Sequence, residues 1–451
     1  MGKAIEKFNN IKIVKTFQNI WRIEDLRTRI LITLMFVTIY RFGSYVVLPG
    51  IDTEALQGLH NQTEGGLMSL LDMFSGGAFS KASIFGLGIM PYISASIVMQ
   101  LLGIAVPYFQ KMQREGESGR RKMNQYTRYL TVAILIFQGP MYLLNLQTTT
   151  GGTALYSSLD WNMFFITGTI ILAAGSMFVL WLGERITDKG IGNGVSMIIM
   201  IGIVARFPNA VIQEYSSRFN GQGGLIICLV EVVLFLAVIA AAILLVQGVR
   251  QIPVNYAKRI AGSRQIGGAR QYIPLKPYAA NVMPIIFAQA IMFVPITCAQ
   301  FVSGGKLNPV VSQLIDNNSF VYNLIFAILI VLFTYLYTAI TINPVQMAED
   351  MKRNNGFIPG IKPGKDTADY IDTIMSRITF PGSLFLALIA ILPAFAGFFG
   401  VQREFAAFFG GTSLLILVGV VLDTLMQIES HLMMRHYDGL LETGRVRGEH
   451  A

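Results

Sequence analysis

The sequence predicts an all-α integral membrane protein with ten transmembrane helices in two inverted five-helix halves. Hydrophobic residues make up 53% of the 451 residues and charged residues only 14%, whereas a soluble protein carries about 25% charged residues. Long apolar runs recur along the chain without the period-two alternation of a β-barrel. Lys and Arg gather between alternate runs, which is typical of loops on one side of a membrane.

Ten stretches of the chain approach the length of about 20 mostly apolar residues that a membrane-spanning helix needs. The first begins after Arg29 and ends at Pro49 and Gly50. The fifth is short for a span, and the sixth carries Glu231. The predicted spans are 30–48, 84–106, 129–146, 162–182, 195–213, 225–246, 282–302, 320–341, 378–398 and 405–422.

The predicted loops differ sharply in positive charge. With a cytoplasmic N-terminus, the inside segments hold 29 of the 35 Lys and Arg residues, the outside segments hold five, and Arg41 lies in the first span. Since positive loops stay inside, residues 1–29 and the tail 427–451 are both predicted to be cytoplasmic. The first 25 residues have no long apolar run behind their charges, so no cleavable signal peptide is predicted.

Ten spans divide into a first half, 30–214, and a second half, 215–426, with five spans each. An odd number of spans inverts the second half relative to the first. Inverted halves are common in transporters and channels, so this topology is compatible with both.

Two inside loops, 247–281 and 342–377, are too long and too basic to be simple turns. Pro359-Gly360 and Pro363-Gly364 predict tight turns, and with Gly267-Gly268 they favour shaped hairpins over a floppy tether. Two explanations of this charge are open: ordinary positive-inside topology, and a docking surface for a large cytoplasmic partner. The shaped turns favour the docking surface. The docking candidates are Lys258, Arg259, Arg264, Arg270, Lys352, Arg353, Lys362 and Lys365.

The outside segment 65–77 has an apolar run too short to span a membrane. Glycine pairs bracket it, and it contains Asp72, whose charge would be costly against lipid. Such a segment is tolerated at membrane depth only when it packs in protein or lines a cavity. It is either an interfacial re-entrant turn or a movable lid.

Signals for catalysis are weak. The four histidines lie in predicted loops and tails and the two cysteines in apolar runs, so no metal site and no cofactor are predicted. Residues 189–194 lack the Gly-Lys-Ser/Thr end of a phosphate loop and are interpreted as a helix-start turn. Only Arg41, Glu231 and Asp423 are ionisable residues in or beside the predicted spans, which counts against an ion-coupled transporter. The chain is predicted not to be an enzyme.

Four strings of residues, 83–96, 190–194, 357–364 and 410–416, closely resemble the SecY family, the central subunits of the bacterial protein-translocation channel. The strings are long and lie in the family's order, and the similarity runs from about residue 20 to 440. The resemblance implies an hourglass channel that conducts unfolded polypeptides across the cell (inner) membrane and releases hydrophobic segments sideways into the lipid. It also implies partners: small SecE and SecG-like membrane subunits, the SecA motor ATPase, the ribosome, and the preprotein with its signal peptide.

The resemblance also assigns site residues. Val195, Lys81 and Lys362 depart from the family, which has isoleucine at the first position and arginine at the other two. The pore ring would be Ile89, Ile93, Val195, Ile199, Ile286 and Ile416. The plug would be 65–77, with Leu67, Leu70, Leu71, Asp72 and Phe74. The lateral gate would include Ser94 and Gln289, with Gln100 and Asn193 as nearby polar candidates.

Two rival functions remain at this point. An ion-coupled secondary transporter of small solutes would share the ten inverted spans, but it would need a polar site at the middle of the membrane. A polytopic membrane enzyme would need a group of catalytic side chains. The sequence shows neither feature.

Overall fold

The computed structural model describes residues 21–53, 72–150, 155, 160–219, 224–256, 259–261, 264–266, 270–277, 283–292 and 319–443, except positions 22, 73 and 290. Among them, seven helices are long and apolar enough to cross a membrane, or eight if the bent pair 90–103 and 107–113 counts as one span. A mostly helical membrane protein is thereby confirmed, and the number of ten spans stays a prediction. The chain forms two compact units: unit 1 is 1–206 with 420–451, and unit 2 is 207–419.

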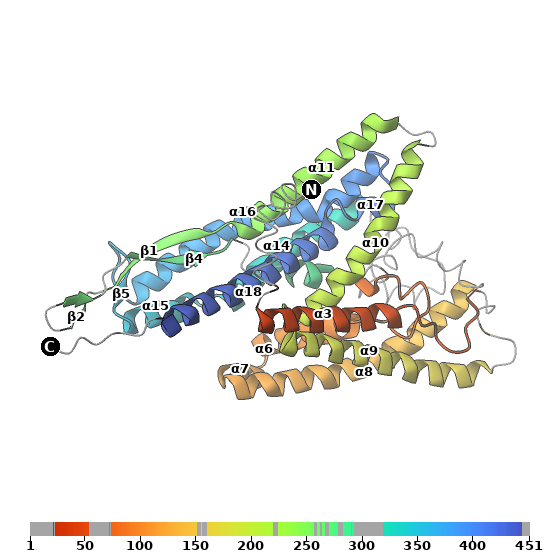
Figure 1. Ribbon diagram of the computed structural model, residues 1–451, viewed down its shortest axis with the longest axis horizontal. Coiled ribbons are helices and arrows are strands. Elements are labelled where there is room, and N and C mark those ends of the chain that lie inside the picture. Colours follow the sequence, from red (N-terminus) through yellow and green to blue (C-terminus); the bar gives the residue numbers. More distant parts are fainter. Residues whose placement is uncertain are drawn as a thin grey trace. The chain divides into compact units, whose positions relative to one another are not determined.

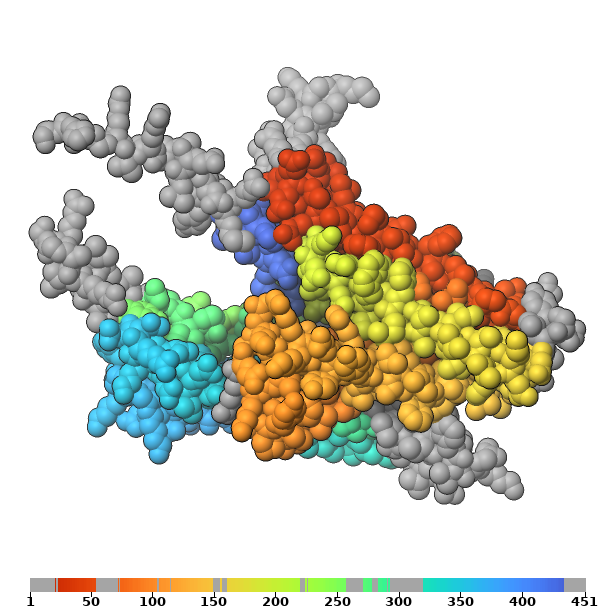
Figure 2. Space-filling view, turned by 90° about the horizontal axis from the view of Figure 1, so that it is seen from below, coloured from red at the N-terminus to blue at the C-terminus, as the bar shows by residue number. Residues whose placement is uncertain are grey.

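Unit 1 is built from helices that pack along their sides. They are α3 (Glu24–Gly43), α6 (Met90–Ala105), α7 (Pro107–Arg114), α8 (Glu117–Thr150), α9 (Trp161–Lys189), the first part of α10 (Gly194–Phe219) and the part of α18 (Gly411–Thr443) from Val420 on. Helix α9 lies between α3 and α8, and α8 also packs against α6 (Figures 1 and 2). Leu48, Phe79, Tyr142 and Leu143 are among the buried side chains of one core cluster.

Two predicted spans of unit 1 have different bounds in the structure. The span predicted at 84–106 becomes helical only at Met90, because residues 84–89 form turns. It stops at Val106, whose extended backbone precedes Pro107; a residue before proline is driven out of the helical region. The span predicted at 129–146 belongs to the much longer α8, so most of the predicted loop 107–128 is helical.

The turn between α9 and α10 has glycines where the structure leaves no room for a side chain. A Cβ on Gly190 would lie 2.4 Å from the Thr33 Oγ1 atom, and one on Gly194 would lie 1.9 Å from the Gly183 carbonyl oxygen. Gly192 has φ +83°, a value that L side chains rarely adopt. The amide of Gly192 donates to Gln427 Oε1 at 2.8 Å. The interpretation of 189–194 as a helix-start turn is confirmed.

Replacement of Gly194 by alanine is expected to destabilise the protein by about 1–3 kcal/mol, because the added methyl forces the backbones of α9 and α10 apart. Thermal unfolding in detergent measures the change. Gly183→Ala is the matched control, because its Cβ would meet Ile198 and Val195 at an ordinary 3.4 Å. Equal melting temperatures for the two variants would contradict the close-approach explanation.

Unit 2 holds the remaining helices. They are the end of α10, α11 (Gly224–Gln247), α14 (Phe320–Thr341), α15 (Pro344–Arg353), α16 (Lys365–Phe398), α17 (Arg403–Ala406) and the start of α18 (Gly411–Thr443). Helix α16 packs against α14, α11 and α15. Of the span predicted at 282–302, residues 283–289 and 291–292 are described and helical.

The last two predicted spans have shifted bounds. Helix α16 starts at Lys365, well before the predicted 378, and therefore takes up the end of the predicted loop 342–377. The span predicted at 405–422 is split into α17 and α18. Helix α18 starts at Gly411 and continues to Thr443, so most of the predicted tail 427–451 is helical.

The two basic loops of unit 2 fold together and add short β-strands to the predicted all-α fold. Their strands are β1 (Arg250–Tyr256), β2 (Arg259–Ala261), β3 (Arg264–Ile266), β4 (Arg270–Leu275) and β5 (Gly356–Phe357). One sheet has the antiparallel order β4-β1-β5, and β2 pairs with β3. Strand β5 comes from the second loop, so the sheet joins both loops. We call these strands together with residues 344–365, which contain α15 and the first residue of α16, the loop cap (Figure 1).

A hydrophobic core fixes the loop cap on the end of α16. Val254 from β1 and Leu275 from β4 pack in one cluster with Met351 from α15 and Ile371 and Met375 from α16. Alternate residues of β1, Ile252 and Val254, are buried, as expected for a strand with one covered face. The prediction of shaped hairpins is confirmed.

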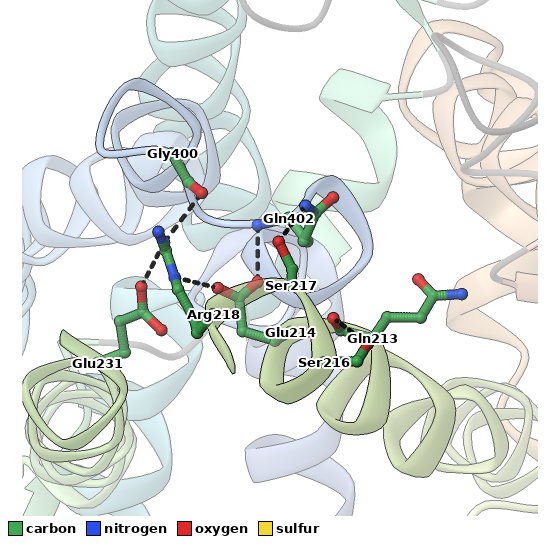
Figure 3. A network of polar contacts seen from close by, with 8 residues as sticks. All are labelled: Gln213, Glu214, Ser216, Ser217, Arg218, Glu231, Gly400 and Gln402. Carbon is green, nitrogen blue, oxygen red and sulfur yellow. Dashed lines mark hydrogen bonds and ion pairs between the residues drawn. The ribbon is translucent and has the colours of Figure 1, made fainter. Parts of the chain in front are cut away.

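A buried ion cluster ties three segments of unit 2 together (Figure 3). Arg218 near the end of α10 donates to Glu214 Oε1 at 2.8 Å, to Glu231 Oε1 of α11, and to the carbonyl oxygen of Gly400 at 2.9 Å. The amide of Gln402 donates to Glu214 Oε2 at 2.7 Å. The prediction that only three ionisable residues lie in or beside the spans is wrong, since α10 carries three more, Arg206, Glu214 and Arg218.

Candidate functional site

The described end of the predicted plug, residues 72 and 74–77, continues into a compact turn, and we call residues 72 and 74–80 together the root segment. Asp72, Phe74 and Ser75 are helical, and all three are buried. The amide of Gly77 donates to the carbonyl oxygen of Asp72 at 2.9 Å, which closes the turn. The other predicted plug residues, Leu67, Leu70 and Leu71, lie outside the described residues.

The carboxylate of Asp72 is the polar centre of the root segment. Its Oδ2 atom accepts from Arg206 Nη1 of α10 at 2.9 Å, and its Oδ1 atom accepts from the amide of Ser80 at 2.8 Å. The Asp72 side chain is 3% exposed and that of Arg206 18%. A buried carboxylate with a cation and an amide donor is well compensated.

Further contacts join the root segment to neighbouring helices of unit 1. Arg41 of α3 donates to the carbonyl oxygen of Gly76 at 3.0 Å, and Tyr40 donates to that of Ser75 at 3.1 Å. Tyr142 of α8 donates to the carbonyl oxygen of Phe79 at 2.7 Å. The root segment is therefore held by α3, α8 and α10.

Arg206 was missed as a site residue because charge counting assigned it to an outside loop. It lies inside α10, surrounded by apolar residues in sequence. A cation within the predicted span 195–213 and an acid within the short apolar segment 65–77 form an oppositely charged pair. That coincidence was the available signal, since charges inside membrane helices seek partners.

The predicted pore ring divides between the two units. In unit 1, Ile89 stands at the N-cap of α6 and its carbonyl accepts from the amide of Ile93 at 3.1 Å. Val195 and Ile199 lie one turn apart at the start of α10, and Ile199 is buried. In unit 2, Ile286 is partly buried in a helical stretch and Ile416 is buried in α18. The ring of six stays a prediction.

The predicted lateral-gate residues have different surroundings. Gln100 donates to Ser96 on its own helix, and Ser94 is partly buried there. Asn193 is exposed, and its side chain accepts from the amide of Ser196 at 3.3 Å, which caps α10. Gln289 is buried, and its Oε1 atom has no hydrogen-bond partner among the described residues. Their joint role as a gate also stays a prediction.

The predicted docking residues gather on the loop cap. Arg259, Arg264 and Arg270 belong to β2, β3 and β4, and Lys258 lies outside the described residues. The remaining four are exposed: Lys352, Arg353, Lys362 and Lys365. Gly360 and Gly364, with φ +85° and +113°, shape the turns that carry the last two.

The family model SecY matches residues 83–425, most of the chain. The chain belongs to the SecY family. The protein translocase subunit SecY of Streptomyces galbus is 42% identical over 95% of this chain and 100% of its own length. That of Aquifex aeolicus is 41% identical over 93% of this chain and 97% of its own.

Solved structures support the fold of this SecY-family chain. A SecY structure described for its plug domain, which stabilises the closed state and maintains a membrane seal, matches with a TM-score of 0.60. It is 18% identical, and the match covers 93% of this chain and 95% of that one. Sec61 in the canine ribosome-channel complex matches with a TM-score of 0.57 at 16% identity, with the same coverage. The chain therefore has the fold of the multi-pass SecY and Sec61 channels.

Proposed function

We propose that this chain is the central pore-forming subunit of a protein translocase. It conducts unfolded polypeptides across the cell membrane and releases hydrophobic segments sideways into the lipid. The observation that carries the proposal is 42% identity over 95% of the chain to a protein translocase subunit SecY. At that similarity over full length, an ion-coupled transporter of small solutes is not favoured. The chain contributes a pathway, and a partner supplies the energy.

The proposal includes the arrangement and the partners of the channel. Both termini lie in the cytoplasm, segment 65–77 is the plug, and the six ring residues close the waist. Small SecE and SecG-like membrane subunits, the SecA motor and the ribosome are the proposed partners. A neighbour described as yeast Ssh1 bound to the 80S ribosome supports the ribosome among them.

Reconstitution tests the function directly. The chain, with its copurifying small membrane subunits, is placed in lipid vesicles, and a SecA motor, ATP and a labelled preprotein are added outside. Protease protection of the preprotein is the expected result. Vesicles that accumulate a small solute along an ion gradient, and protect no preprotein, would overturn the proposal.

Docking through the loop cap gives a second prediction. Alanine at Lys352, Arg353, Lys362 and Lys365 is expected to weaken ribosome binding on the order of ten-fold or more at low salt, because phosphate contacts dominate binding to nucleic acid. The loss should shrink as salt rises. Co-sedimentation of the chain in detergent with ribosomes measures it.

A matched control carries four alanines at exposed cations outside the loop cap, in α7 and α8. Ribosome binding at the wild-type level in the loop-cap variant, or an equal loss in both variants, would contradict docking at this surface. The control positions are Lys111, Arg120, Arg121 and Lys122.

A further inference from the structure

Arg206 is an unusual residue for its place in the chain. From Gly194 to Gln213 it is the single charged residue of α10. A cation within a membrane helix is costly, and such residues generally carry a function. Arg206 forms an ion pair with Asp72 of the root segment, 134 residues away in the chain. Helix α10 therefore carries a positive charge that pairs with a negative charge of the root segment.

Helix α10 and the root segment also match in shape. Gly202 lies one helical turn before Arg206, so both face the same side of α10. A Cβ on Gly76 would lie 2.8 Å from the Gly202 Cα atom, and one on Gly202 would lie 3.1 Å from the carbonyl oxygen of Phe74. The root segment therefore meets α10 at two points, a backbone contact at glycines and an ion pair at Asp72.

The two carboxylate oxygens of Asp72 make hydrogen bonds with separate roles. The Oδ1 bond to Ser80, with the bond from Gly77 to the Asp72 carbonyl, holds the turn together from inside. The Oδ2 bond to Arg206 joins that turn to α10. Loss of Arg206 would remove the ion pair that joins the turn to α10 and leave the internal bonds of the turn in place.

We propose that Arg206, seated beside Gly202, is the positioning residue that clasps the root segment to α10 and holds the channel closed at rest. This inference rests on the proposed function, because it assigns a closing role to a segment of the proposed channel. The attraction within an ion pair is strong when dry and falls steeply in water. Water that follows an entering polypeptide therefore weakens the clasp.

Idle ion conductance in a planar bilayer tests the clasp. Arg206→Gln is expected to raise the leak on the order of ten-fold, because it strands the buried Asp72 charge, a change that strongly weakens such contacts. Gly202→Ala should also raise the leak, although it removes no charge. Conductance with a substrate trapped in the pore should match the wild type in both variants, since the clasp is then already open.

A double-variant cycle shows whether the pair acts directly. Asp72→Asn with Arg206→Gln should leak no more than the worse single variant, because no charge is stranded. Arg128→Gln is the matched control: it removes the ion pair with Glu184 that joins α8 to α9 at 2.7 Å, away from the root segment. Its leak should stay at the wild-type level, and unchanged α-helical circular dichroism of all variants at the working temperature excludes misfolding.

Two results would separate the clasp from the proposed function. If wild-type protein translocates a preprotein while Arg206→Gln and Gly202→Ala keep the wild-type seal, the clasp is overturned and the function stands. If wild-type protein translocates nothing under the same conditions, the proposed function falls.

Discussion

Replacement of Arg218 by methionine is expected to destabilise the protein by about 3–5 kcal/mol, because loss of one partner leaves a buried charge uncompensated. The carboxylates of Glu214 and Glu231 both accept hydrogen bonds from the Arg218 guanidinium, and the three side chains are 4–8% exposed. In the variant, two carboxylates would remain in an apolar setting without their shared cation. Thermal unfolding in detergent, with α-helical circular dichroism as the signal, measures the loss.

The control removes the whole ion cluster. Glu214→Gln, Arg218→Met and Glu231→Gln together should restore most of the stability, since replacing a buried ion group with neutral residues is often nearly neutral. Glutamine at position 214 keeps an acceptor for the amide of Gln402. A triple variant as unstable as Arg218→Met alone would show that lost packing, and not a stranded charge, explains the effect.

Apolar runs in the sequence predicted the helix bounds well where an apolar stretch gives way abruptly to polar residues. The span predicted at 320–341 coincides with α14, Phe320–Thr341, because Pro344 and polar residues follow it directly. Helices α8 and α16 extend far into charged sequence, to Glu117 and Lys365. A helix needs only its backbone hydrogen bonds to continue, so hydropathy marks the part inside the membrane and misses the rest.

The polar contacts could be predicted far less well than the helices. The charge count used to orient the loops assigned Arg206 and Arg218 to an outside loop, although both lie in α10. Their partners Asp72 and Gly400 are distant in sequence, so only the folded chain brings them together. The third strand of the loop-cap sheet was missed for a related reason: β5 has two residues and pairs with a strand about 100 residues earlier.

Polar substitutions in the predicted pore ring are expected to have the second large effect, on the idle ion conductance. A waist lined by aliphatic side chains offers a sliding polypeptide no hydrogen-bond partner, and a narrow apolar constriction excludes ions by dewetting. Asparagine at Ile93, Ile199 and Ile286 should therefore admit water and raise the idle ion conductance on the order of a hundred-fold, if each polar side chain lowers the barrier by about 1 kcal/mol. Passage of a polypeptide should persist, because the waist becomes no narrower.

Leucine at the same three positions is the matched control, since it keeps volume and apolar character, and its conductance should stay near wild type. An asparagine variant that seals as well as wild type would show that these residues do not form the waist.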